Sequence, residues 1–265
     1  MFADELRRLF RRPRSIVILV IVAVVPIALG VIAKTLGAGG SGGPPFFSQL
    51  TQNPIFLSLV ALTTMQPFVL PLMVSLVAGD AIAGEASSGA LRYLLVAPAS
   101  RVKIVLIKTA SALIFAIVIA LVVALAGGLA GALLFHTGKI ITLSGTEVSQ
   151  ARGILLTFEA SLVVGVSLFS VVGVGIFVST LTDSPSAASA ITVGVAIASE
   201  ILGGVPQLVH IQPILLSNYW QSFIDLFRDP QILHNVGRNL IEQGGWLVAS
   251  VVAALVNFTQ RDITS

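Results

Sequence analysis

"AGDAIAGEASSGALRYLLVAPASRVKIVLIK", residues 78–108, lies between two long apolar runs and concentrates charge in a chain that has little of it. It holds six charged side chains: Asp80, Glu85, Arg92, Arg101, Lys103 and Lys108. Of the 265 residues, 55% are hydrophobic and only 10% are charged, whereas soluble domains carry about 25% charged residues. Such a chain cannot cover a water-facing surface, so we predict an all-α integral membrane protein.

The apolar runs on both sides of this stretch have the length of membrane spans, since a helix needs about 20 apolar residues to cross a bilayer. We predict six transmembrane helices, at residues 15–33, 54–78, 104–135, 160–181, 186–205 and 241–258. Residues 1–265 then form a single transmembrane domain. Before the sixth span, residues 206–240 are expected to be a structured segment, with a separate helix that begins at Asp229-Pro230 and ends at Gly244.

The distribution of basic residues predicts the orientation of these spans. Six crossings place both termini on one side, together with the quoted stretch. That side carries ten of the 15 Lys and Arg residues. Because basic loops stay on the cytoplasmic side of a membrane, both termini and the quoted stretch are predicted to be cytoplasmic.

The N-terminal sequence "MFADELRRLFRRPR", residues 1–14, predicts an amphipathic helix that lies in the cytoplasmic headgroup layer. Its apolar face is formed by Phe2, Leu6, Leu9 and Phe10, and its basic face by Arg7, Arg8, Arg11, Arg12 and Arg14. Two interpretations remain open for this elbow helix. It is either a basic topology anchor or an element that also contacts a cytoplasmic partner.

Within the quoted stretch, residues 90–97 are predicted to form a second short amphipathic helix, which ends before Pro98. A simple connector between two spans needs only a few polar residues. A short helix lying crosswise at the membrane surface is suited instead to receive movement from a cytoplasmic partner and to pass it into two spans at once.

Residues 84–108, "GEASSGALRYLLVAPASRVKIVLIK", resemble the coupling region of the membrane subunits of type 2 ATP-binding cassette (ABC) exporters. In that family Gly-Glu and a few further residues are followed by Gly-x-Leu-Arg/Glu, two or three apolar residues, Pro-x-Ser/Thr-Arg and a lysine. The matching residues here, in order, are Gly84, Glu85, Gly89, Leu91, Arg92, Pro98, Ser100, Arg101 and Lys108. The resemblance covers the whole chain in layout, but only this segment is specific in its residues.

The resemblance implies a permease subunit in a prokaryotic plasma membrane, paired with an identical or paralogous permease. Two separate ATPase subunits would bind ATP and Mg and would dock on the cytoplasmic coupling segment. The docking contacts implied are Glu85, Gly89, Leu91, Arg92, Leu94, Leu95, Pro98 and Arg101. The residues predicted to form the interfacial elbow are Phe2, Leu6, Arg7, Arg8, Phe10, Arg11 and Arg12.

This chain itself contains no phosphate-binding loop motif, so it is expected to be a non-catalytic subunit. Its three histidines lack the spacing of metal ligands. We therefore expect no cofactor or metal in this chain, and we expect membrane lipid rather than nucleic acid as its surroundings.

Three polar or kinked positions inside the spans are candidate pathway residues: Gln66, Pro67 and Glu200. Gln66 beside Pro67 can form a polar kink that either lines the route or aids packing. Glu200 is either a pathway contact or a residue of an outer vestibule or subunit contact. Ser167 is expected to serve helix packing.

The sequence leaves the cargo open, with a drug, a lipid or another amphipathic compound favoured by the apolar spans. One alternative is an ATP-independent secondary carrier that uses Glu200. Such carriers have internal repeats and paired ionisable residues at mid-membrane, and the sequence contains no clear repeat. A second alternative keeps the family but replaces export with another ATP-coupled role, in assembly or resistance.

Overall fold

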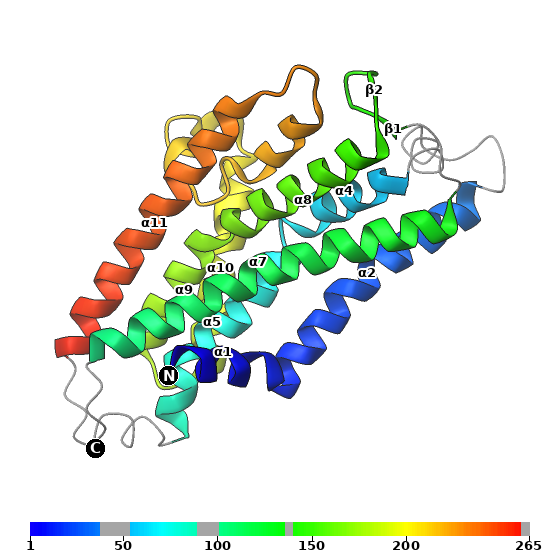
Figure 1. The fold of residues 1–265 in the computed structure, drawn as a ribbon. Coiled ribbons are helices and arrows are strands. Elements are labelled where there is room, and N and C mark those ends of the chain that lie inside the picture. The colour runs from blue at the N-terminus through cyan, green and yellow to red at the C-terminus, as the bar shows by residue number, and fades with distance from the viewer. Residues whose placement is uncertain (38–53, 89–100, 136–139, 261–265) are drawn as a thin grey trace.

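The structure is a computed structural model that describes residues 1–37, 54–88, 101–135 and 140–260. Its elements are, in order, α1 (Phe2–Arg11), α2 (Pro13–Gly37), α4 (Pro54–Met65), α5 (Val69–Ser87), α7 (Arg101–Leu134), β1 (Ile140–Ile141), β2 (Glu147–Val148), α8 (Gln150–Ser167), α9 (Phe169–Leu181), α10 (Pro185–Gly203), η1 (Pro206–Leu208), η2 (Gln212–Ile214), η3 (Trp220–Phe227) and α11 (Leu233–Gln260). The long helices lie side by side in one bundle (Figure 1). We call its two ends the elbow end, where α1 lies, and the hairpin end, where β1 and β2 lie.

Within the described residues, six helical segments are long and apolar enough to cross a membrane: α2, α5, α7, α8 with α9, α10 and α11. Large apolar side chains such as Val20 (55% exposed) and Ile241 (78% exposed) face outward, whereas Asn239 and Gln243 are fully buried. Such a surface suits lipid rather than water as the solvent. The predicted all-α membrane fold with six spans is therefore confirmed.

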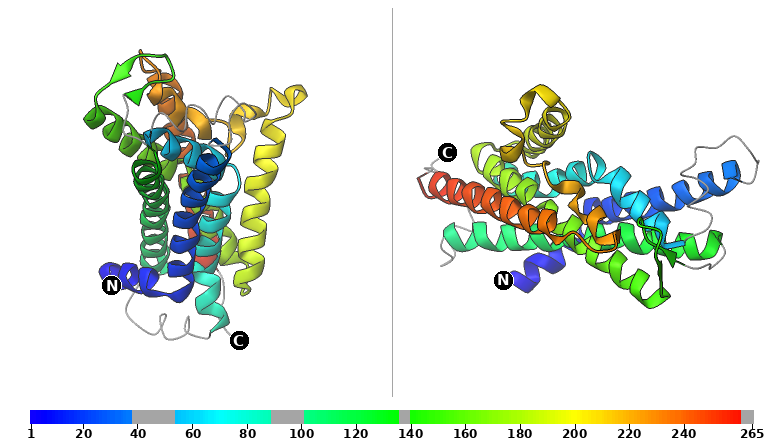
Figure 2. Two further views of the ribbon diagram at one scale, coloured as in Figure 1. Left: turned by 90° about the vertical axis from the view of Figure 1, so that its right-hand side faces the viewer. Right: turned by 90° about the horizontal axis from the view of Figure 1, so that it is seen from above.

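The N-terminal helix α1 is separate from the first span and lies across the elbow end of the bundle (Figure 2). Asp4 and Glu5 occupy its first turn, where negative charge stabilises a helix. It ends because Arg12 adopts an extended conformation (φ −64°, ψ 132°), which is what a residue before proline favours. Pro13 then begins α2, a position that proline tolerates because its missing N–H has no partner there.

Residues 54–78, predicted as one helix, are divided between two helices, of which only α5 has the length of a membrane span. Helix α4 ends at Met65, and α5 begins at Val69, after the Gln66-Pro67 pair. Pro67 cannot donate the backbone hydrogen bond that would continue α4. The far boundary also differs, because α5 continues to Ser87 instead of ending before Asp80.

Helices α7 and α10 begin and end within three residues of the predicted spans, whereas α8 begins ten residues earlier than predicted, at Gln150. Ser149 caps α8, since its Oγ accepts a hydrogen bond from the backbone N–H of Arg152 at 3.3 Å. At the other end, α8 passes into α9 with one break, at Leu168. The fourth span is therefore longer than its apolar core alone indicates.

The prediction of a separate outer helix ending at Gly244 was wrong. Helix α11 runs from Leu233 to Gln260 without interruption, so the proposed outer helix is the first part of the last span. Glycine is more frequent inside membrane helices than inside soluble ones, so Gly244 does not have to end the helix. The preceding segment contains the three short helices η1, η2 and η3, in agreement with the predicted structured segment.

At the hairpin end, β1 and β2 form an antiparallel hairpin, whose turn includes Gly145 with a φ of +84°. Only glycine adopts this conformation without strain. The turn is attached to the segment before α11, because the backbone N–H of Leu143 donates to Phe227 O at 2.9 Å. Ser144 Oγ also accepts from the backbone N–H of Asp229, at 2.9 Å.

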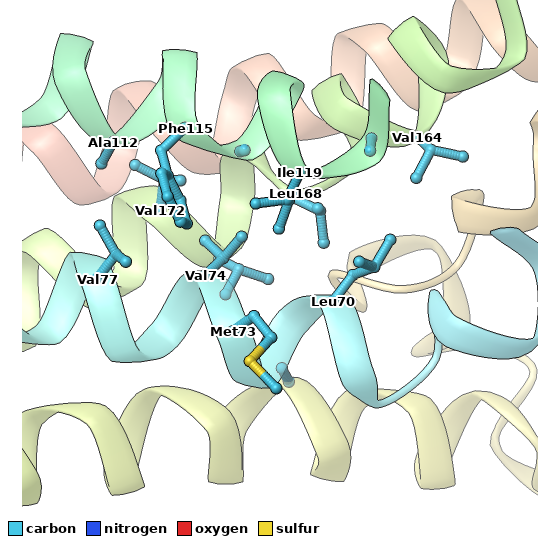
Figure 3. Packing of buried hydrophobic residues seen from close by; sticks show 14 of the residues in the cluster. Leu70, Met73, Val74, Val77, Ala112, Phe115, Ile119, Val164, Leu168 and Val172 are labelled. Atoms are coloured by element: carbon cyan, nitrogen blue, oxygen red, sulfur yellow. The ribbon is translucent and has the colours of Figure 1, made fainter. Parts of the chain in front are cut away.

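Helices α5, α7, α8 and α9 enclose the main hydrophobic core (Figure 3). The labelled side chains come from these four helices and from the break between α8 and α9, and they include Leu70, Phe115, Ile119, Leu168 and Val172, all of them fully buried. This core packs together the helices that contribute residues to the two polar sites described next.

Candidate functional site

A buried lysine joins three helices at the elbow end. Lys108, in the second turn of α7, is 5% exposed. Its Nζ lies 2.7 Å from Glu5 Oε1 of α1 and also forms an ion pair with Glu85 Oε1 of α5. We call Lys108, Glu5 and Glu85 the Lys108 cluster. It connects the two helices that lead into and out of residues 89–100, and it connects both of them to α1.

The charges of the Lys108 cluster depend on one another because little water reaches them. Glu85 is 7% exposed, and a lone carboxylate in such a place is strongly disfavoured. Removal of one partner from a buried ion pair destabilises a protein by about 3–5 kcal/mol. The cluster therefore favours one arrangement of the three helices and opposes their separation.

Two further contacts fix the elbow end. Asp80 of α5 forms ion pairs with Arg12 at 3.0 Å and with Arg14 at 3.6 Å. Arg101, the first residue of α7, donates from Nη1 to Phe258 O at 2.9 Å, and its guanidinium lies 6.0 Å from the centre of the Phe258 ring. The start of α7 is thus attached to the end of α11.

Helix α5 is also held by its neighbours immediately before Glu85. Ser179 Oγ of α9 donates to Gly79 O at 2.7 Å and accepts from the backbone N–H groups of Ile82 and Ala83 at 3.0 and 2.8 Å. A Cβ atom at Gly79 would lie 2.6 Å from the backbone nitrogen of Ser189. The contacts between α5, α9 and α10 therefore depend on small residues, as is common between membrane helices.

The structure describes only two of the eight predicted ATPase contacts, Glu85 and Arg101. Glu85 is buried in the Lys108 cluster, and Arg101 is half-buried. The other six, which are Gly89, Leu91, Arg92, Leu94, Leu95 and Pro98, lie outside the described residues. Their proposed contact with an ATPase stays a prediction.

The predicted elbow residues divide into two groups. Arg7, Arg8 and Arg11 are exposed and Arg12 is half-buried, in agreement with a basic outer face. The apolar face packs partly on the bundle itself, because the ring of Phe10 lies 5.6 Å from that of Phe115 in α7. Leu6 is half-buried and Phe2 is exposed.

Sequence reasoning missed the partnership of Glu5 with Lys108. In the sequence, Lys108 stands out only as the last residue of the motif, and nothing marks Glu5 as its partner. The available signal was the position of Lys108 inside the first turns of an apolar span, since a cation there needs a nearby anion. The sequence does not say which carboxylate supplies it.

A second group of polar residues lies inside the bundle, on the buried face of α11. Asn235, Asn239 and Gln243 are spaced by four residues and so lie on one side of the helix. Asn239 Nδ2 donates to Ser167 Oγ at 2.7 Å, next to the α8–α9 break. Gln243 Nε2 donates to Leu216 O at 2.9 Å. Ser167 thus serves helix–helix contact, as predicted.

The candidate pathway residues occupy different environments. Gln66 is fully buried at the α4–α5 break, and neither its Nε2 nor its Oε1 has a hydrogen-bond partner among the described residues. Pro67 beside it is half-buried. Glu200 is half-buried in the last turn of α10, where its carboxylate lies beside Ser217. Glu200 therefore lies at the end of a span and is partly exposed, whereas Gln66 lies between two helices and is fully enclosed by protein.

A group of three or more His, Asp or Glu residues that could hold a metal ion is not found in the part of the chain that the structure describes.

The whole chain was also compared with known proteins. The family model described as "ABC-2 family transporter protein" matches residues 2–263. No curated protein matches the chain.

Proposed function

We propose that this chain, which belongs to the ABC-2 transporter family, is the permease of an ATP-driven exporter. Members of that family are non-catalytic, multi-pass membrane components that work with an ABC ATPase. Separate ATPase subunits, two per complex, would bind ATP and Mg and dock on residues 80–103. A second permease, identical or paralogous, would complete the pathway.

The observation that carries this proposal is the position of the Lys108 cluster. Glu85 lies two residues before the end of α5, and Lys108 lies in the second turn of α7. These are the helices on either side of residues 89–100, which lie within the stretch that resembles the coupling region in sequence. A push on that segment would reach α5 and α7 together, and the ion pair with Glu5 would carry it to α1.

The orientation follows from the basic residues at the elbow end. Arg7, Arg8 and Arg11 are exposed there, and exposed arginines favour the cytoplasmic side of a membrane. We therefore propose that the elbow end and both termini face the cytoplasm, and that the membrane is the plasma membrane of a prokaryote. The hairpin end would then face outward.

The cargo is proposed to be a drug, a lipid or another amphipathic compound. The apolar spans support an apolar or amphipathic molecule. Gln66 adds a buried amide at the α4–α5 break, which has no hydrogen-bond partner among the described residues. A pathway for a small ion would be expected instead to carry paired ionisable side chains.

Site-directed cross-linking tests the docking surface, and the absence of natural cysteine makes it direct. Ser87, the last residue of α5, is exposed, so a Ser87→Cys variant carrying a benzophenone maleimide should cross-link an ATPase in native membranes. Thr146, exposed at the opposite end in the β1–β2 turn, provides the control variant Thr146→Cys. Mass spectrometry should identify a phosphate-loop protein on the first variant and not on the second.

Transport assays then test the coupling. We expect Arg92→Glu to leave membrane insertion intact and to lower transport per ATP hydrolysed. If no ATPase is captured at Ser87→Cys, or if it is captured equally at Thr146→Cys, the proposed docking surface is wrong.

A further inference from the structure

A cavity of about 440 Å³ opens on the side of the bundle between α4, α7 and α8. We call it the α7–α8 groove. Its walls include Leu125, Leu129, Ile154 and Phe158, which are 63%, 65%, 65% and 49% exposed. The groove therefore opens sideways, toward the surroundings of the protein rather than toward its core.

The floor of the groove is formed where α4 and α7 approach each other closely. A Cβ atom at Gly127 would lie 2.8 Å from the Cα atom of Ser58, so the two backbones are in contact there. The next residue, Gly128, lines the groove, and a Cβ atom at that position would meet only Ser58 Oγ, at 3.4 Å. The absence of a side chain at Gly128 thus leaves part of the groove empty.

The groove walls offer few polar groups, because each hydroxyl in them already has a partner. Ser58 Oγ donates to Ala124 O at 2.8 Å. Thr157 and Ser161 donate to backbone carbonyls of their own helix, at 3.0 and 2.7 Å. A water molecule needs two to four polar partners in a buried site, so these walls favour an apolar occupant.

The height of the groove matches one leaflet of a bilayer. On α8 its lining extends from Gln150 to Ser161, and on α7 from Leu121 to Ala132. Each of these stretches rises by about 16 Å at ~1.5 Å per residue. The hydrocarbon core of a bilayer is about 30 Å thick, so one leaflet contributes about 15 Å. The groove thus extends from the hairpin end, where Gln150 is exposed, toward the middle of the span.

We propose that the α7–α8 groove binds one acyl chain of a bilayer phospholipid from the leaflet at the hairpin end. The chain fills the space beside Gly128, and the headgroup lies at the level of Gln150. The bound lipid supplies apolar contacts that α4, α7 and α8 do not make with one another. This site does not depend on the proposed transport function.

The test counts retained phospholipids. The full-length protein, with whatever subunits co-purify, is reconstituted into vesicles of dioleoylphosphatidylcholine, extracted in a mild detergent and measured by native mass spectrometry. The wild type should retain at least one dioleoylphosphatidylcholine, and Gly128→Leu should retain one fewer. The control is Gly245→Leu on α11, the same change at an exposed position where a Cβ atom meets nothing within 4 Å, and it should match the wild type.

A second variant protects the test against misfolding. Ala132→Leu adds bulk from the exposed side of the groove, away from the close contact between Gly127 and Ser58, and should also remove one phospholipid. Should Gly128→Leu or Ala132→Leu fold and still retain as many phospholipids as Gly245→Leu, the proposal is wrong. It is equally wrong if the wild type retains none.

Discussion

Replacing Lys108 with methionine tests the central contact of the elbow end. Methionine keeps most of the length and apolar volume of lysine but removes its charge. Glu5 and Glu85 would then lie close together without a cation, in a place where the Glu85 side chain is 9% exposed and the Glu5 side chain 16%. The folded protein should lose stability for an electrostatic reason rather than a packing reason.

The size of the loss follows from the burial of the cluster. Removal of one partner from a buried ion pair destabilises a protein by about 3–5 kcal/mol. Because each kcal/mol corresponds to about 2–4 °C for a protein of 150–250 residues, the melting temperature should fall by roughly 6–20 °C. Neutralising both carboxylates as well, with Glu5→Gln and Glu85→Gln, should recover at least half of this fall.

The assay is thermal unfolding in detergent, followed by tryptophan fluorescence. Lys34→Met is the matched control, because Lys34 is exposed in the last turn of α2, and it should melt with the wild type. If Lys108→Met also melts within about 2 °C of the wild type, a shift below that of a single kcal/mol, the cluster does not stabilise the elbow end. If the variant with both glutamines shows no recovery, the effect is one of packing and the electrostatic argument fails.

Two further predictions concern α5. Gly79→Leu should prevent folding, because its Cβ atom would lie 2.6 Å from the backbone nitrogen of Ser189. The control is Gly194→Leu on α10, where a Cβ atom meets nothing within 4 Å. In size-exclusion chromatography the control should elute as the wild type does, and Gly79→Leu should not. Asp80→Asn removes the ion-pair partner of Arg12, but Asp80 is 22% exposed and Arg12 34% exposed. We therefore expect a loss below about 1 kcal/mol, which disappears in 1 M salt because charges are screened there; a larger, salt-independent loss in denaturation experiments would contradict this.

The boundaries of α10 show what local sequence can predict. The predicted span, 186–205, differs from the observed helix, Pro185–Gly203, by one and two residues. Its start is marked locally, because Ser184 Oγ accepts from the backbone N–H of Ala187 and Pro185 occupies the first turn. The boundary of α5 has no such mark, since Asp80 and Glu85 lie inside the helix with partners from α1, α2 and α7.

The sequence by itself determined the membrane fold, the number of spans, the elbow helix and the family, because apolar run length, charge distribution and a short motif are properties of neighbouring residues. Only the tertiary structure decided that Glu85 pairs with Lys108 and Glu5 and that Asn239 meets Ser167. It also decided that α4, α7 and α8 leave a groove beside Gly128. These features depend on which faces of distant helices meet, and that choice is made by the packing of the whole bundle, where a buried charge or amide is stable only beside a partner from another helix.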